Sequence, residues 1–368
     1  MSLLSPLIAR RIRQDVQAMH AYAVQDAQGM VKLDAMENPH RLSPALQEAL
    51  GRRLGALALN RYPDPDGRIN DLRHALAQYA DMPAGFDIML GNGSDELIAL
   101  LAMVCEGAVL APLPGFVMYA MSAQLQGRDF VGVPLTSDFA LDEDAMGSAI
   151  RQHQPAIIYL AYPNNPTANL WDESTIAKII AIAAEVDSLV VIDEAYQPFA
   201  SRTYLDTIRR QPERHAHVLL MRTLSKFGLA GVRLGYMMGD AALMAQIDKV
   251  RPPYNISVLN CECALFALEN KEVFAAQALD IRAQRAILLE ALRALEGAKK
   301  GVKVWESDAN MILVRVPDAQ KTFAALKHAG ILVKNVSTMH PLLAQCLRLT
   351  VGTEAENTQL LAAFEPSL

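Results

Sequence analysis

The stretch Leu189-Val190-Val191-Ile192-Asp193-Glu194-Ala195-Tyr196 joins a short apolar run directly to two carboxylates. Such a run, bounded by polar residues, predicts a buried strand. Further runs of this kind lie at residues 88–90, 108–111, 130–135, 156–161, 218–221 and 235–238. Helix-like segments separate several of them, which predicts an α/β fold with a mainly parallel, seven-stranded sheet. Open sheets of this class bind ligands at the carboxyl ends of their strands, so we expect Asp193 and Glu194 beside a site.

The segments between and after these runs predict the helices and the domains. Asp172 is placed to cap a helix that carries one apolar stripe, formed by Ile176, Ile179, Ile180 and Ala183. After Asn255 the sequence changes to a long Ala- and Leu-rich helix, and then to an α+β segment. We therefore predict three parts: an N-terminal arm at residues 1–30 that joins the small domain, a large domain at 31–255 and a smaller α+β domain at 256–368.

Composition argues against several classes of function. The 368 residues are 52% hydrophobic and 20% charged, with a net charge of -6, a pI near 5.8 and no basic block, which predicts no nucleic-acid partner. The apolar run at 97–105 is too short to cross a bilayer, and no secretory core precedes the arginines near the N-terminus, so we expect a cytoplasmic protein without membrane contact. The four cysteines are scattered and are expected to be reduced. His215 and His217 have no third ligand nearby, so no metal is expected.

Three short stretches contain the residue types that pyridoxal phosphate (PLP) requires. They are Tyr162-Pro163-Asn164-Asn165-Pro166-Thr167, Asp193-Glu194-Ala195-Tyr196 and Thr223-Leu224-Ser225-Lys226. PLP chemistry needs a lysine for a Schiff base, a carboxylate that keeps the pyridine nitrogen protonated, and hydrogen-bond donors for a phenolate oxygen. Lys226, Asp193, and Asn165 with Tyr196 match these needs. Separately, each stretch is also compatible with a turn, a helix cap or a solvated lysine.

A phosphate site is predicted near the same lysine. Gly91-Asn92-Gly93-Ser94-Asp95-Glu96 links a predicted strand to a predicted helix, and small residues at a helix N-terminus let backbone N–H groups approach an anion. Alone, this segment is more typical of a capped glycine turn than of a phosphate site. Thr223, Ser225 and Arg233 add two hydroxyls and a guanidinium around Lys226, which strengthens the prediction.

Taken together, the motifs resemble the fold-type I, PLP-dependent aminotransferases, and within them the histidinol-phosphate branch. The resemblance extends over nearly the whole chain, and outside the three central stretches it rests on four segments. They are Leu33-Asp34-Ala35-Met36-Glu37-Asn38-Pro39, Arg61-Tyr62-Pro63-Asp64-Pro65, Pro112-Leu113-Pro114-Gly115-Phe116, and Cys346-Leu347-Arg348-Leu349-Thr350-Val351-Gly352-Thr353.

The resemblance implies a role for each matching residue. Lys226 would be the Schiff-base lysine and general acid/base, Asp193 would pair with the pyridinium nitrogen, and Asn165 and Tyr196 would hold the 3′-oxygen. Phe116 would stack on the ring, and the phosphate would be held by Ser94, Asp95, Thr223, Ser225 and Arg233. Tyr62 would reach that phosphate from the neighbouring subunit of a homodimer. Arg348 would bind the acidic end of substrates.

The implied reaction is transamination of L-histidinol phosphate with 2-oxoglutarate, which gives imidazole-acetol phosphate and glutamate. Lys334 occupies a position where many histidinol-phosphate enzymes carry an arginine, and Tyr22 is a candidate third substrate contact. Ala168 stands where the family commonly has glycine, and Met36 replaces a usual asparagine. Aromatic amino acid transamination and decarboxylation of threonine phosphate remain alternatives on the same scaffold. A PLP-sensing regulator would need a DNA-binding domain, for which the N-terminal arm is too short.

Overall fold

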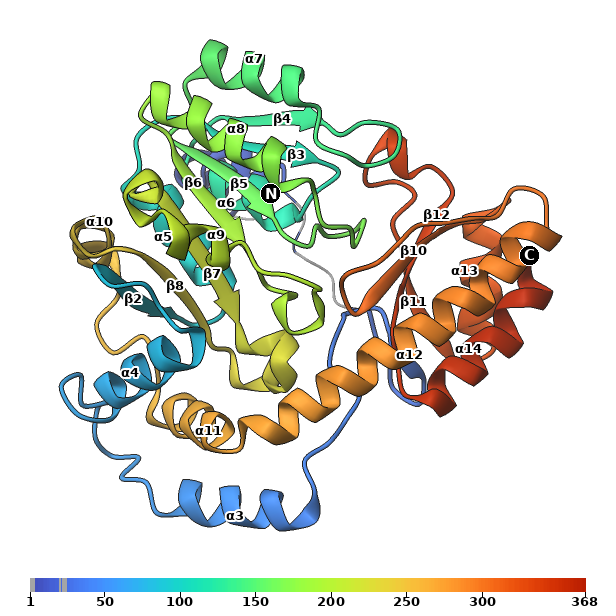
Figure 1. Cartoon of the computed structure of the whole chain (residues 1–368), viewed down its shortest axis with the longest axis horizontal. Helices are drawn as coiled ribbons and strands as arrows, with labels where there is room; N and C mark the ends of the chain where they lie inside the picture. The colour runs from blue at the N-terminus through green and yellow to red at the C-terminus, as the bar shows by residue number, and fades with distance from the viewer. Residues whose placement is uncertain (1–3, 20, 22–24) are drawn as a thin grey trace.

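A computed structural model describes residues 4–19, 21 and 25–368, whose strands form two sheets (Figure 1). The larger sheet has the spatial order β2 (Phe86–Gly91), β8 (Gly235–Asp240), β7 (Val218–Thr223), β6 (Leu189–Asp193), β5 (Ile157–Ala161), β3 (Val109–Leu113), β4 (Phe130–Pro134). Neighbouring strands are parallel except around β8, which runs antiparallel to both β2 and β7. The predicted α/β fold with a mainly parallel, seven-stranded sheet is confirmed.

Helices cover both faces of this sheet, because successive side chains of each strand point to opposite sides. Ile158 and Leu160 of β5 belong to one apolar cluster, which includes α4 (Arg68–Ala80), α7 (Glu143–His153), α8 (Glu173–Glu185), α9 (Leu205–Arg210) and α11 (Val258–Glu269). Ile157 and Tyr159 belong to a second, with α5 (Ser94–Val104), α6 (Val117–Leu125) and α10 (Ala241–Ile247). The large sheet is therefore the middle layer of three.

Helix α8 forms as its sequence predicts. The Asp172 carboxylate accepts a hydrogen bond from the Thr175 backbone N–H at 3.0 Å and so caps the first turn. The predicted apolar stripe, Ile176, Ile179, Ile180 and Ala183, is buried. Both the start of this helix and its buried face are confirmed.

The smaller sheet has the order β1 (Val31–Leu33), β11 (Ile331–Asn335), β12 (Cys346–Thr350), β10 (Met311–Arg315), β9 (Lys303–Val304). Its apolar side packs on α12 (Lys271–Ala298), α13 (Ala319–His328) and α14 (Glu354–Ser367). Helix α12 runs between the two parts (Figure 1), with Phe274 in the core of the larger part and Leu288 in that of the smaller. The predicted domain boundaries at residues 30 and 255 stay a prediction, although β1, just after the first of them, pairs with β11 of the smaller sheet.

The N-terminal segment carries three further helices: α1 (Leu4–Arg11), α2 (Gln14–Gln17) and α3 (Pro44–Gly55). Arg13, beside α2, donates hydrogen bonds to the backbone carbonyls of Gln124 and Leu125 at the end of α6. Among the described residues, no helix is both long and apolar enough to cross a membrane.

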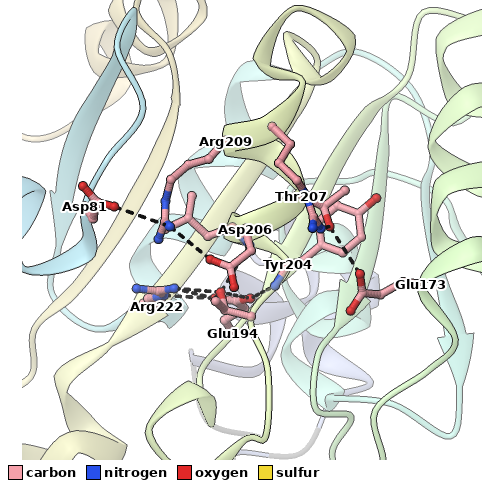
Figure 2. A network of polar contacts seen from close by, with 11 residues as sticks. Asp81, Glu173, Glu194, Tyr204, Asp206, Thr207, Arg209 and Arg222 are labelled. Atoms are coloured by element: carbon pink, nitrogen blue, oxygen red, sulfur yellow. Dashed lines mark hydrogen bonds and ion pairs between the residues drawn. The ribbon is translucent and has the colours of Figure 1, made fainter.

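A buried ion pair ties together the ends of β6 and β7. Glu194 directly follows β6, and Arg222 lies near the end of β7; their side chains are 0% and 8% exposed, and Arg222 Nη2 lies 2.8 Å from Glu194 Oε2. The other carboxylate oxygen accepts a hydrogen bond from the Tyr204 backbone N–H at 2.6 Å (Figure 2). Burial opposes the charge of Arg222, but Glu194 keeps its pKa above the ordinary value. Arg222 therefore keeps its charge, and both carboxylate oxygens of Glu194 accept hydrogen bonds.

We expect Arg222→Ala to lower the free energy of unfolding by about 3–5 kcal/mol, because it leaves the buried Glu194 charge without its partner. Arg209 is a matched control from the same network: it pairs with Asp206 at 3.0 Å and Asp81 at 3.4 Å near the surface (Figure 2). Arg209→Ala should cost less than about 1 kcal/mol. Urea unfolding of both variants measures the difference, and equal losses would contradict the assigned role of Arg222.

Candidate active site

The three motif stretches meet at the carboxyl edge of the larger sheet. A cavity of about 350 Å³ lies there, a size typical of small-molecule sites. It is lined by ten of the residues predicted from the sequence: Ser94, Asp95, Phe116, Asn165, Asp193, Tyr196, Thr223, Ser225, Lys226 and Arg233. The fold thus brings together residues that are up to 139 positions apart in the chain.

Lys226 lies in the short π-helical turn η3 (Ser225–Leu229), which follows β7. Its ammonium donates a hydrogen bond to the Ala35 carbonyl at 2.9 Å and lies 5.9 Å from the centre of the Tyr196 ring. Burial lowers the pKa of Lys226 to about 8, and the nearby Arg348 acts in the same direction. An amine with this pKa is far more often neutral near pH 7 than an exposed lysine, and it is therefore a better nucleophile.

Asp193 is the last residue of β6, and its carboxylate is buried. One oxygen accepts a hydrogen bond from the Tyr119 hydroxyl at 2.6 Å, and the other accepts one from the Ala195 backbone N–H at 3.0 Å. Burial raises the pKa of Asp193 to about 6, while both hydrogen bonds act against this rise. A buried carboxylate of this kind is well suited to stabilise a cationic ring placed next to it.

Tyr119 is a residue of this site that the sequence analysis missed. It lies in the first turn of α6, and its ring stacks on Tyr159 with the centroids 4.2 Å apart and the planes 5° apart. Burial raises the pKa of Tyr119 well above 10, so it remains a phenol that donates to Asp193. The available sequence signal was the spacing of three residues between Phe116 and Tyr119, which places the two rings on the same side of a helix. That signal does not indicate which strand the hydroxyl reaches, because this depends on how α6 packs on the sheet.

Hydroxyls and a guanidinium line the other end of the cavity, as predicted for a phosphate site. The Thr223 hydroxyl donates to the Ser225 hydroxyl at 3.0 Å, and Arg233 approaches that same oxygen at 3.4 Å. Arg233 also pairs with Asp95 in the first turn of α5 at 3.4 Å. The helix N-terminus and these three donors surround one position, an arrangement that favours an anion.

Two glycines allow close packing of the backbone beside this end of the cavity. A Cβ atom on Gly235 would lie 2.7 Å from the backbone nitrogen of Ser94, closer than real Cβ atoms approach. A Cβ atom on Gly93, where φ is +85°, would lie 2.6 Å from Arg233 Nη2. Side chains at either position would clash with these neighbours, so the two glycines allow the α5 N-terminus to lie against the start of β8 and beside Arg233.

A second cavity, of about 590 Å³, shares Phe116, Asn165 and Lys226 with the first. It contains both predicted substrate cations of the described chain, Arg348 and Lys334. Arg348 donates to the Asn165 side-chain oxygen at 2.7 Å and to the Asp34 carbonyl at 2.6 Å. Asn165 in turn donates to the Tyr196 hydroxyl at 3.1 Å, so one hydrogen-bond chain connects the two cavities.

The remaining predicted residues do not join these cavities. Tyr62 is 78% exposed, stacks on Tyr254 with centroids 4.5 Å apart, and lines neither of the two. Tyr22 lies outside the described residues. The sequence analysis also missed Lys32 and Glu37, which line the second cavity.

Comparison with known proteins is consistent with this geometry. The family model described as "Aminotransferase class I and II" matches residues 28–364. The chain belongs to this family. One curated relative, the histidinol-phosphate aminotransferase of Polaromonas naphthalenivorans (strain CJ2), is 70% identical over 100% of this chain and 99% of the relative. Another, the histidinol-phosphate aminotransferase of Paracidovorax citrulli (strain AAC00-1), is 66% identical over 97% of each chain. The crystal structure of histidinol-phosphate aminotransferase from Sinorhizobium meliloti, in complex with pyridoxal-5′-phosphate, has the same fold, with a TM-score of 0.82, 24% identity and 97% of both chains covered.

This aminotransferase uses PLP, as the sequence predicted, and the residues at the first cavity fit that cofactor. The cavity offers an amine of lowered pKa, a buried carboxylate, an amide with a phenol, and a helix N-terminus with three side-chain donors. These groups correspond to the aldehyde, the ring nitrogen, the 3′-oxygen and the phosphate of PLP. Among the described residues, no cluster of His, Cys, Asp and Glu could hold a metal ion.

The lowered pKa predicts how fast Lys226 captures PLP. We expect that Lys226 is labelled when apoprotein is mixed with PLP and the product is trapped with borohydride. The labelling rate should rise about tenfold per pH unit and level off above about pH 8, where the amine is neutral. Exposed lysines, with a pKa near about 10.4, provide internal controls in the same peptide map. A midpoint near 10.4 for Lys226, or dominant label on another lysine, would contradict the assignment.

Proposed function

We propose that the chain transfers the amino group of L-histidinol phosphate to 2-oxoglutarate, giving imidazole-acetol phosphate and glutamate in histidine biosynthesis. The observation that carries this proposal is the pair Lys334 and Arg348, which are directly opposite each other on β11 and β12 and line one cavity with Lys226. Two cations next to a reactive lysine suit a substrate whose far end is a phosphate. High identity to curated enzymes of that name supports the same conclusion.

The residues of the first cavity take the following roles in this proposal. When bound, PLP withdraws electrons from the reacting carbon of the substrate. Lys226 would hold the cofactor through its side-chain amine and, when that amine is free, would act as the general acid/base that moves the proton at the substrate carbon. Asp193, oriented by Tyr119, stays ionised beside the protonated ring nitrogen. A cationic partner favours that ionisation and opposes the rise in pKa that burial causes.

The other predicted residues position the cofactor. Asn165 and Tyr196, which are hydrogen-bonded to each other at 3.1 Å, would share the 3′-oxygen. Phe116 would cover one face of the ring. The phosphate would be held by Ser94, Asp95, Thr223, Ser225 and Arg233, with Asp95 acting through its ion pair to Arg233.

One cationic pocket must accept two different substrates. Histidinol phosphate presents a phosphate, whereas glutamate and 2-oxoglutarate present a distal carboxylate. Arg348, with its planar fork of donors, suits either group, while Lys334 acts as a point charge that favours the more highly charged phosphate. Tyr22 is proposed as a third contact.

Substrate kinetics test the proposal. Wild-type enzyme should prefer histidinol phosphate over phenylalanine, tyrosine and threonine phosphate. Arg348→Ala should depress kcat/KM for both natural substrates, by about 2–5 kcal/mol of transition-state binding, and Lys334→Ala should affect the phosphate substrate more. Equal turnover of phenylalanine would instead favour an aromatic aminotransferase, and carbon dioxide release from threonine phosphate would favour the decarboxylase.

We further propose a cytoplasmic homodimer in which Tyr62 completes the phosphate site of the neighbouring subunit. Tyr62 and its stacking partner Tyr254 are 78% and 51% exposed. Two adjacent exposed aromatic rings are typical of a surface that another chain covers. This proposal accounts for a tyrosine within a family motif that lines neither cavity of its own chain.

Subunit mixing tests the shared site. Tyr62→Phe and Lys226→Ala should each be impaired as homodimers, but the heterodimer contains one site with both defects and one site with neither. Mixing should therefore restore up to about half of wild-type activity per heterodimer, a ceiling that follows from one intact site out of two. Absence of recovery, with subunit exchange verified by native mass spectrometry, would place Tyr62 in its own chain's site.

A further inference from the structure

Lys32 lies on the same face of the smaller sheet as the two proposed substrate cations. In the parallel pairing of β1 with β11, Lys32 is opposite Leu332, and Lys334 lies two residues further along β11. Residues two apart on a strand share a face, so Lys32 and Lys334 point to the same side. Arg348 is directly opposite Lys334 on β12 and completes a row of cations across three adjacent strands.

This row of cations faces the second cavity. All three cations line the cavity of about 590 Å³, together with Lys226 and the two carboxylates Asp34 and Glu37. Like charges on neighbouring strands repel one another, so such a row favours an anion in front of it. Lys32 Nζ is held by Glu37 Oε2 at 2.6 Å, and these side chains are 34% and 42% exposed. Ion pairs that are exposed to this degree contribute little net stability and are readily exchanged.

We propose that Lys32 is a third cation for the phosphate of the donor substrate, and that Glu37 holds Lys32 until the phosphate displaces it. The inference rests on the proposed function, and it assigns a specificity role to a residue outside the predicted site. A phosphate monoester carries close to two negative charges and three acceptor oxygens. Arg348 and Lys334 match this charge, but Arg348 already donates to Asn165 and to the Asp34 carbonyl and Lys334 makes a single-point contact, so Lys32 adds a donor for the remaining oxygen. A carboxylate has one charge and two oxygens, so it gains less from Lys32. Lys32 therefore discriminates the phosphate substrate from 2-oxoglutarate.

The test compares histidinol phosphate with histidinol, its dephosphorylated analogue. In Lys32→Gln, kcat/KM for histidinol phosphate should fall about tenfold through KM, while values for histidinol and 2-oxoglutarate change less than twofold. Inorganic phosphate, used as a competitive inhibitor, should bind about tenfold more weakly. Lys32→Arg should restore both properties. Lys178→Gln is the matched control, because Lys178 forms a similar pair with Glu143 at 2.9 Å on the surface, away from both cavities.

Glu37→Gln provides a second, opposite test. In the otherwise wild-type enzyme, Glu37→Gln releases Lys32 and should therefore lower the inhibition constant of inorganic phosphate. In the Lys32→Gln enzyme the same change should lower that constant less, because there is no lysine to release.

The outcomes separate this inference from the function on which it rests. Suppose that the wild type strongly prefers histidinol phosphate, but that Lys32→Gln leaves this preference unchanged or lowers kcat/KM equally for histidinol phosphate and histidinol. The role of Lys32 is then wrong, and the proposed function stands. If the wild type does not distinguish histidinol phosphate from histidinol, the proposed function itself fails.

Discussion

The buried pair of Glu194 and Arg222 is the constraint on which the site depends. Asp193 immediately precedes Glu194, and Lys226 follows Arg222 by four residues, so the pair constrains the distance between two groups that line the first cavity. Replacing a buried ion pair with apolar residues often leaves stability unchanged, so its value lies in holding one arrangement of two strand ends. Glu194 also accepts a hydrogen bond from the Tyr204 backbone N–H, and this contact further fixes the segment that follows β6.

Burial disfavours the charged forms of both Asp193 and Lys226, and this affects the stability of the fold. The pKa of Asp193 is about 6 in the folded chain and 3.8 in the unfolded one, so its ionisation costs stability fully above pH 6 and not below 3.8. The pKa of Lys226 is about 8 against 10.5, so its protonation costs stability fully below pH 8 and not above 10.5. Near pH 7 both costs act at once, and the rest of the fold must offset them. A cofactor that is cationic at its ring nitrogen and bonds Lys226 covalently relieves both.

Sequence patterns predicted the large sheet and most of the first cavity, because both depend on local signals. The strands were marked by apolar runs, and the residues at their carboxyl ends had to meet at one edge. Tyr119 and Lys32 escaped prediction for a different reason. Tyr119 reaches Asp193 only because α6 packs on β3 and β4 and its ring lies against Tyr159 of β5, the strand next to β6. Lys32 joins Arg348 only through the register of β1 on β11. Register across distant segments is a tertiary property that no local pattern contains.

Two of the departures from the family pattern, Ala168 and Met36, have a physical explanation in the fold. Ala168 and Met36, where the family commonly has glycine and asparagine, both have positive φ, at 64° and 51°. An ordinary side chain in this conformation costs about 1–2 kcal/mol, which explains the family preference. Both side chains are buried in the core of the smaller part, and burial returns about 0.8 kcal/mol per methylene-sized group. The Ala168 carbonyl also accepts from the Asp308 N–H at 2.7 Å, and the Met36 carbonyl accepts from Asn310 at 3.0 Å. Apolar contact at these two positions therefore offsets the conformational cost of the positive φ angles.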